Sequence, residues 1–278
     1  MTTDLLLEKN RAIMAYVEKS IIPIVCDHTQ DGKRTAGTCG TGSLFEFDGK
    51  YFLLTASHLF DAVNEVKDWI GIPVAQRNSE IYTLDKCVLS RPDTAQEREK
   101  YDIAILRLDD SIAKEMKRSY KFLTYANVDR VRYNEQFYVS GFPFTFSKLF
   151  VETNQVVGIP FRFMSRHKSP SQEDYRWFDP AVHILVEYSE TYYENGINPR
   201  PVAAPSDLEG ISGCSIWNYE DDPKGIWAPE TCLKVVGIQT GVRRGSYIKG
   251  TKWGYVINGF ASVDQAIYQK LVEAIKAK

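Results

Sequence analysis

The chain has 278 residues, of which 44% are hydrophobic and 25% charged, so it is long enough to bury the core of one large domain or two. A net charge of −2 gives no electrostatic case for binding nucleic acid or an anionic membrane surface. No apolar run approaches the roughly 18–20 residues that a membrane-spanning helix requires. The five cysteines are odd in number and form no CxxC pair, which argues against a disulfide framework or a zinc site and favours a reducing, cytoplasmic location.

The N-terminal segment reads as a helix followed by a lead-in. Apolar residues recur at helical spacing over 5–22, which predicts an amphipathic helix that Pro23 ends. Because this segment lacks a basic start and a long apolar stretch, we expect no secretory signal peptide. A strand is expected to begin at 24–26, and the polar segment 27–38 is expected to form a loop.

Two β-prone runs then open the first strand-rich half. Residues 40–47 and 50–55 are joined by Asp48-Gly49, a dipeptide typical of tight hairpins. The second run leads directly to His58, which we expect at a strand end. There the side chain is either held rigidly toward a cleft or buried in a structural role. Further on, Asp102 heads an apolar strand expected at 101–108. Carboxylates seldom stand beside such runs unless something neutralises them, although a strand-capping aspartate fits too. Short strands are also expected at 70–74, 82–84 and 86–89, with a charged surface loop at 91–100.

The second half is again rich in short strands. After a helical or irregular connector at 110–120, strands are expected at 135–140, twice within 148–163, and at 182–188, 215–217, 233–240 and 253–257. Exposed insertions are expected at 166–180 and 220–229, and an irregular loop at 192–205. We therefore predict an N-terminal helix and lead-in (1–39), a first β-barrel (40–130), a second β-barrel (131–261) and a C-terminal helix (262–278).

A serine between glycines is the main chemical signal. Ser212 lies in the run Gly-Ile-Ser-Gly at 210–213, just before a strand, where glycines allow a sharp turn. By itself this run fits a surface turn equally well. Catalysis would need a base, an orienting group and donors for an oxyanion. His58 and Asp102 precede the serine in chain order, and a histidine can accept the serine proton while an aspartate fixes its tautomer. The three residues together predict a nucleophilic site.

These segments resemble the three catalytic motifs of trypsin-like (chymotrypsin-fold) serine peptidases. Residues 55–58, 101–106 and 210–213 match in order and spacing, and the likeness is greatest to bacterial or intracellular members. The resemblance implies an all-β fold of two antiparallel six-stranded β-barrels with the site in the cleft between them. It implies a serine endopeptidase that cleaves protein or peptide substrates through an acyl-enzyme intermediate, without cofactor or metal.

The resemblance also assigns roles around the triad. The backbone N–H groups of Gly210 and Ser212 would form the oxyanion hole. The strand at 233–241 would bind substrate backbone, with Gly241 at its end and Thr240 where a serine often supports the aspartate. Ser206 would lie at the floor of the specificity pocket.

Two departures from the family pattern leave a second hypothesis open. Ile211 stands where secreted members carry an aspartate that captures a newly cut N-terminus, and Cys214 replaces a glycine. A binding or sensor module with the protease fold and a latent triad therefore remains an alternative. An α/β-hydrolase is disfavoured, because the motif is Gly-x-Ser-Gly-Cys rather than Gly-x-Ser-x-Gly and the chain order is His, Asp, Ser.

Overall fold

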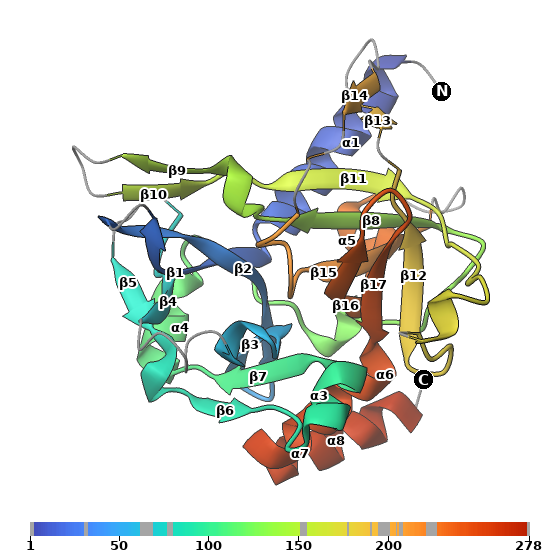
Figure 1. Cartoon of the computed structure of the whole chain (residues 1–278). Coiled ribbons are helices and arrows are strands. Elements are labelled where there is room, and N and C mark those ends of the chain that lie inside the picture. Colours follow the sequence, from blue (N-terminus) through green and yellow to red (C-terminus); the bar gives the residue numbers. More distant parts are fainter. Residues whose placement is uncertain are drawn as a thin grey trace.

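A computed structural model describes residues 3–30, 33–61, 69–76, 80–150, 155–176, 178–189, 191–193, 201–203, 205, 208–220 and 227–276. Two curled antiparallel sheets make up the body of the protein (Figure 1). This arrangement confirms the chymotrypsin-like all-β class. The first sheet has seven strands where six were expected, and the second has six.

The first sheet is formed by residues of the N-terminal half, in the order β5-β4-β1-β2-β3-β7-β6. Its strands are β1 (Ile21–Gln30), β2 (Lys33–Phe47), β3 (Lys50–Ala56), β4 (Ile70–Pro73), β5 (Ile81–Thr83), β6 (Val88–Ser90) and β7 (Ile103–Arg107). The β2–β3 hairpin turns at Asp48 and Gly49, whose φ values of 52° and 71° are the left-handed pair that a two-residue turn of this kind requires. The predicted hairpin is therefore confirmed, and it fixes the direction in which β3 approaches His58.

The second sheet has the order β11-β8-β15-β16-β17-β12. Its strands are β8 (Gln136–Gly141), β11 (Phe161–Ser165), β12 (His183–Glu187), β15 (Ser215–Tyr219), β16 (Leu233–Arg243) and β17 (Tyr247–Lys252). Two small ribbons pair β9 (Ser147–Phe150) with β10 (Gln155–Gly158) and β13 (Thr191–Tyr193) with β14 (Pro201–Ala203). The helices are α1 (Thr3–Glu18), α3 (Ala95–Tyr101), α4 (Asp110–Met116), α5 (Pro229–Cys232), α6 (Trp253–Val256), α7 (Phe260–Val263) and α8 (Gln265–Lys276).

Several sequence-based boundaries were wrong in the first half. The helix ends at Glu18 rather than Ile22, because Ile21 and Ile22 are fully buried in β1 and pair with β2. The segment 27–38, expected as a loop, continues the β1–β2 ribbon through backbone pairing, for which its polar composition gave no signal. The loop expected at 91–100 contains α3, whose N-cap Thr94 accepts a hydrogen bond from the backbone of Glu97 (3.1 Å).

The second half also differs in detail. Residues 148–163 contribute to three strands instead of two, and the irregular loop at 192–205 contains parts of β13 and β14. The last strand is β17, whereas the expected strand at 253–257 begins with α6. Trp253 and Val256 are both buried one helical turn apart, and a short apolar run of this kind does not distinguish a helix from a strand.

The largest apolar core lies between the two sheets and includes both terminal helices. Ile13 and Val17 of α1 and Leu271 of α8 belong to the same buried cluster as Trp217 of β15. Tyr16 packs edge-on against Trp217, with ring centroids 6.0 Å apart. The helices at the two ends of the chain therefore stabilise the contact between the sheets and, with it, the cleft.

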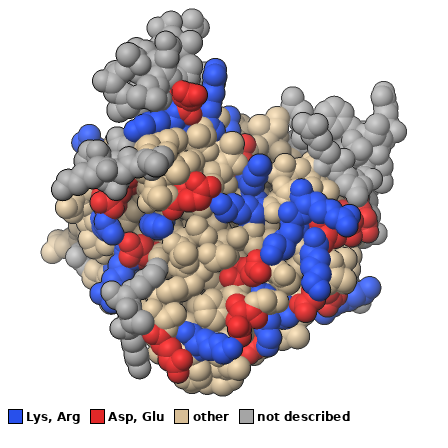
Figure 2. Space-filling model, turned by 180° about the vertical axis from the view of Figure 1, so that it is seen from behind, with Lys and Arg blue, Asp and Glu red and all other residues tan. Residues whose placement is uncertain are grey.

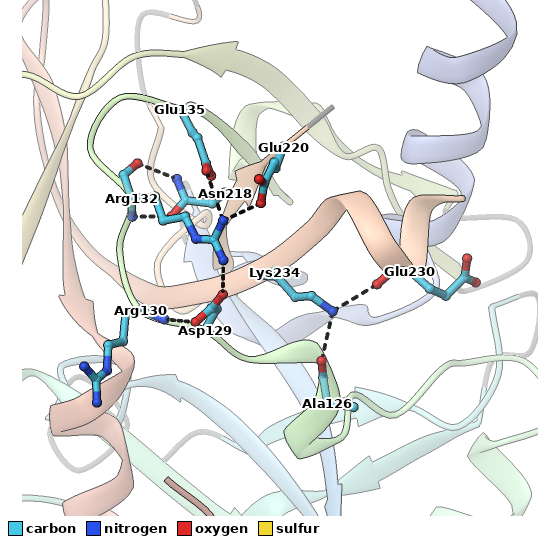
Figure 3. A network of polar contacts seen from close by, with 9 residues as sticks. All are labelled: Ala126, Asp129, Arg130, Arg132, Glu135, Asn218, Glu220, Glu230 and Lys234. Atoms are coloured by element: carbon cyan, nitrogen blue, oxygen red, sulfur yellow. Dashed lines mark hydrogen bonds and ion pairs between the residues drawn. The ribbon is translucent and has the colours of Figure 1, made fainter. Parts of the chain in front are cut away.

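The segment that joins the two sheets is fixed by polar contacts (Figure 3). Asn218, which is buried, exchanges two hydrogen bonds with the backbone of Arg132 (2.9 and 3.2 Å). The Arg132 guanidinium pairs with Asp129 (3.0 Å) and Glu220 (2.5 Å). These bonds hold the end of the connection against β15 of the second sheet.

The exposed surface carries charges of both signs. Figure 2 shows basic and acidic side chains interspersed over the face opposite to the view of Figure 1. None of the helices in the described part of the chain is long and apolar enough to cross a membrane.

Candidate active site

Sheet pairing brings His58 and Asp102 together. β3 and β7 pair with Ala56 opposite Ile103, so the residues that follow β3 lie beside the residue that precedes β7. Asp102 adopts a left-handed conformation (φ 46°, ψ 43°) at the end of α3, which aspartate tolerates better than most side chains. The backbone N–H of Ser57 donates to the Asp102 carbonyl (3.1 Å) and closes this corner.

The Asp102 carboxylate is nearly buried and accepts three hydrogen bonds. Its Oδ2 atom lies 2.7 Å from Nδ1 of His58, and its Oδ1 atom accepts from the His58 backbone N–H (3.0 Å) and the Ser57 hydroxyl (2.9 Å). These donors compensate the cost of burying a charge. Sequence reasoning missed Ser57, although it is adjacent to His58. Thr240, expected to support the aspartate, has a buried hydroxyl with no hydrogen-bond partner among the described residues.

His58 is only half-buried, with 45% of its side chain exposed. Burial lowers its pKa, but the hydrogen bond to Asp102 and the charges of Asp102 and Asp61 outweigh burial and the opposing charge of Lys249. The pKa of His58 is therefore raised above its ordinary value. The carboxylate thus makes the imidazole a better proton acceptor.

The loop that carries Ser212 is shaped by two glycines. Gly210 and Gly213 have φ values of 99° and 94°, where other residues are strained. A Cβ at Gly213 would lie 2.1 Å from both the Thr41 carbonyl and the Thr55 hydroxyl. The residue after Ser212 therefore packs directly on β2 and on the end of β3, which leads to His58.

Thr41 of β2 anchors the same loop, a role that sequence reasoning did not assign. Its backbone N–H donates to the Ser212 carbonyl (2.8 Å), and its hydroxyl donates to the Gly210 carbonyl (2.8 Å). The hydroxyl also accepts from the backbone N–H of Phe142 (2.9 Å). A threonine between two glycines at 40–42 was the only sequence signal, and it was interpreted as the start of a hairpin.

The peptide between Glu209 and Gly210 is oriented by the second sheet. The backbone N–H of Phe144 donates to the Glu209 carbonyl (2.6 Å), and the peptide is trans, so the Gly210 N–H points away from Phe144. Among the described residues, the N–H groups of Gly210 and Ser212 donate to no protein acceptor. Both donors thus remain available to an incoming group.

The two unusual neighbours of Ser212 are buried. Ile211 and Cys214 are 1% and 0% exposed and belong to one apolar cluster of the second sheet. Burial raises the pKa of the Cys214 thiol far above its ordinary value. Apolar packing of Ile211 and Cys214, rather than an ion pair, therefore supports the serine loop.

Ser212 lines a hollow of about 240 Å³, together with Tyr188, Pro205, Leu208, Glu209, Val242 and Arg244. Gly241 lines a second, neighbouring hollow. Ser206, expected at the floor of the pocket, lies outside the described residues. Within the described part of the chain, no hydrogen bond joins the Ser212 hydroxyl to His58.

A family model described as a trypsin-like peptidase domain matches residues 40–182. No curated protein matches the chain. Many solved structures resemble it, among them the following three at low identity. A serine endoprotease from Yersinia pestis has 13% identity and a TM-score of 0.48, with 94% of this chain and 66% of that chain covered. The protease Anisep from Arthrobacter nicotinovorans has 13% identity and a TM-score of 0.48, with 88% and 94% covered.

The third structure comes from work on how aromatic interactions drive the coupled folding and binding of the intrinsically disordered Sesbania mosaic virus VPg protein. It has 14% identity and a TM-score of 0.44, with 84% of this chain and 87% of that chain covered. The family match spans just over half of the 278 residues and includes His58 and Asp102. The chain belongs to the trypsin-like peptidase domain family.

Proposed function

We propose that the protein is a serine endopeptidase that uses Ser212 as nucleophile, His58 as general base and acid, and Asp102 as the orienting carboxylate. The single observation that carries this proposal is the bonding of His58 to Asp102 through Nδ1 (2.7 Å) beside the loop of Ser212. This bond leaves Nε2 of the imidazole as the proton acceptor.

The reaction follows from these positions. The Ser212 hydroxyl attacks the carbonyl carbon of the scissile bond while His58 takes the hydroxyl proton. The N–H groups of Gly210 and Ser212 stabilise the negative oxygen that forms. When the carbon–nitrogen bond breaks, His58 gives the proton to the departing amine. Water, deprotonated by His58, then attacks the acyl-enzyme ester, releases the carboxylic acid product and regenerates the serine.

The orientation of the oxyanion donors supports an active resting state. The hydrogen bond from Phe144 to the Glu209 carbonyl (2.6 Å) fixes the orientation of this peptide, whose Gly210 N–H points the opposite way. The hydroxyl of Thr41 holds the Gly210 carbonyl in place (2.8 Å). A donor pair that is already oriented requires little rearrangement when substrate arrives.

The test is cleavage of a mixed peptide library, with products identified by mass spectrometry. The wild type is expected to cut internal peptide bonds, and Ser212→Ala and His58→Ala are expected to leave the library intact. Ser215→Ala is the matched control, because Ser215 is a buried serine of β15 bonded to Ser43 (2.6 Å) and takes no part in the chemistry. Cleavage that survives Ser212→Ala would refute the proposal.

A second candidate is a binding or sensor module with a latent triad. The observation in its favour is that the Ser212 hydroxyl makes no hydrogen bond to His58 among the described residues. Such bonds are often long in unliganded enzymes and tighten only with substrate. Peptide binding by the wild type without any cleavage would favour this candidate over the peptidase.

We further propose that the protein acts in a reducing compartment such as the cytoplasm. All five cysteines are free: Cys26, Cys39, Cys87, Cys214 and Cys232. The test is peptidase activity with and without a reducing agent. Activity that requires oxidised thiols would contradict this location.

A further inference from the structure

Among the described residues, one edge of β16 has no pairing strand beside Ser212. β16 pairs with β15 up to Ile238, and its last bonds on that side join Gln239 to Gly213 (2.9 Å) and Cys214 (2.8 Å). On its other side, β16 stays paired with β17 through Arg243. The backbone from 240 to 243 therefore offers an edge to which an extended peptide can add as a further strand. This step rests on the proposed peptidase function.

Two adjacent hollows lie along this edge, and Val242 of β16 lines both. Val242 and Arg244 line the hollow of about 240 Å³ that contains Ser212. Gly241 and Arg243 line a second hollow of about 860 Å³, which Lys249 also lines. Because successive side chains of an extended peptide point to opposite faces, consecutive substrate residues enter the two hollows in turn. The residue attacked by Ser212 enters the first, and the residue before it enters the second.

Lys249 can reach that preceding residue because the intervening position is a glycine. In the β16–β17 pairing Lys249 stands opposite Gly241, and a Cβ at Gly241 would lie 3.4 Å from Cε of Lys249. The lysine stem thus runs beside the space that a side chain at 241 would occupy. Any larger residue at 241 would separate Lys249 from a peptide on the open edge.

The surroundings of Lys249 favour a negatively charged partner. Burial lowers its pKa, and the negative charges of Asp102 and Glu99 offset this only in part. The positive charge of Lys249 also lowers the pKa of His58. The ammonium therefore acts on the side of β16 that faces His58. Arg243, in the same hollow, pairs with Asp174 (2.9 Å) and Glu173 (3.3 Å). A substrate carboxylate would bring an opposite charge to the partly desolvated ammonium of Lys249.

We propose that Lys249 is a specificity-determining residue, which makes the peptidase prefer an acidic side chain on the residue immediately before the one whose carbonyl Ser212 attacks. The substrate class is therefore proteins or peptides with aspartate or glutamate at that position. The contact is charge-assisted and partly shielded from water, and such contacts are stronger than neutral ones.

The test uses three fluorogenic peptides that differ only at this position, which is glutamate, glutamine or lysine. For the wild type, kcat/KM is expected to be about tenfold higher with glutamate than with glutamine. Lys249→Gln should remove this ratio, and Lys249→Glu should reverse the preference toward lysine. Lys252→Gln is the control, because Lys252 lies on the same strand with its ammonium on the Pro180 carbonyl (2.5 Å), and it should keep the wild-type ratio.

Binding separates this inference from the proposed function. Fluorescence anisotropy with Ser212→Ala and the same three peptides measures the preference without any cleavage. Tighter binding of the glutamate peptide, lost in Ser212→Ala/Lys249→Gln, supports the inference even if the wild type cleaves nothing. Equal affinities for glutamate and glutamine, or a ratio that survives Lys249→Gln, would overturn it.

Discussion

Asp102 holds His58 at two points: Oδ2 lies 2.7 Å from the ring Nδ1, and Oδ1 accepts the backbone N–H of His58 at 3.0 Å. The first bond selects the tautomer with the proton on Nδ1, and the second fixes the backbone from which the ring extends. A side chain held in this way presents Nε2 in one orientation. The loop of Ser212 packs against the end of β3, which leads to His58, as the proposed base and nucleophile require.

Asp102→Asn tests the orienting role of the carboxylate. An amide cannot stabilise the imidazolium and favours the wrong tautomer, so kcat should fall by roughly 10³- to 10⁴-fold. The measurement is steady-state peptide hydrolysis. Glu99→Gln removes a nearby carboxylate on α3 without touching His58, and it should stay within about threefold of the wild type. A comparable loss of kcat in both variants would show that activity depends on the negative charge around His58 in general and not on the orientation that Asp102 imposes.

The raised pKa of His58 predicts opposite effects of pH on activity and stability. Activity needs the neutral imidazole, so kcat/KM should rise with pH through a midpoint above the ordinary value of about 6.5. Protonated His58 stabilises the folded state. Because the folded pKa is the higher one, this stabilisation is fully present below the unfolded pKa and is lost as pH rises through the folded pKa.

Urea unfolding and pH–rate profiles measure these two effects. In Asp102→Asn the burial of His58 remains without the carboxylate, so the midpoint of the rate profile should move to lower pH. A midpoint that does not respond to this substitution would mean that a different group controls the rate.

Thr41→Val tests the anchor of the oxyanion loop. Valine keeps the shape but loses the hydroxyl that donates to the Gly210 carbonyl and accepts from Phe142. With two buried groups left unpaired, the free energy of unfolding should drop by about 1–3 kcal/mol. The loosened loop should also lower kcat by roughly tenfold or more, with a smaller change in KM. Thr41→Ser retains the hydroxyl and should recover most of kcat, whereas equal losses in the two variants would contradict the anchor.

Gly213→Ala tests the tight packing of the serine loop. The new Cβ would stand 2.1 Å from the Thr41 carbonyl at a φ of 94°, so both clash and backbone strain oppose folding. We expect a loss of at least about 2 kcal/mol in unfolding free energy, measured by chemical denaturation. Gly254→Ala is the control, because a Cβ there would meet no atom within 4 Å. A destabilisation no larger than that of the control would refute this packing.

Much of the fold follows from local signals in the sequence. Asp48-Gly49 specified a hairpin whose two strands pair as expected, and Asp102 at the head of an apolar run marked β7 correctly. The polar ribbon formed by the end of β1 and the start of β2 could not be predicted. Backbone pairing holds these residues together, and their sequence shows no apolar pattern that would indicate a strand. Trp253 was placed in a strand because four apolar residues in five fit either element.

The candidate site divides in the same way. His58, Asp102 and Ser212 could be predicted because each occurs in a motif of several residues. The anchoring contact of Thr41 and the proposed role of Lys249 could not, since the first joins β2 to the loop at Gly210 and the second depends on Gly241 of the neighbouring strand. A single threonine or lysine in the sequence does not indicate which residue of another segment it will contact.

In the proposed mechanism, Ser212 is a nucleophile that His58 activates. The most direct measurement is reaction of the whole protein with a fluorophosphonate, followed by peptide mapping of the adduct by mass spectrometry. We predict one adduct, on Ser212, that forms in the wild type and is lost in His58→Ala. An unmodified Ser212 in the wild type, or an adduct that forms equally fast in His58→Ala, would contradict the claim.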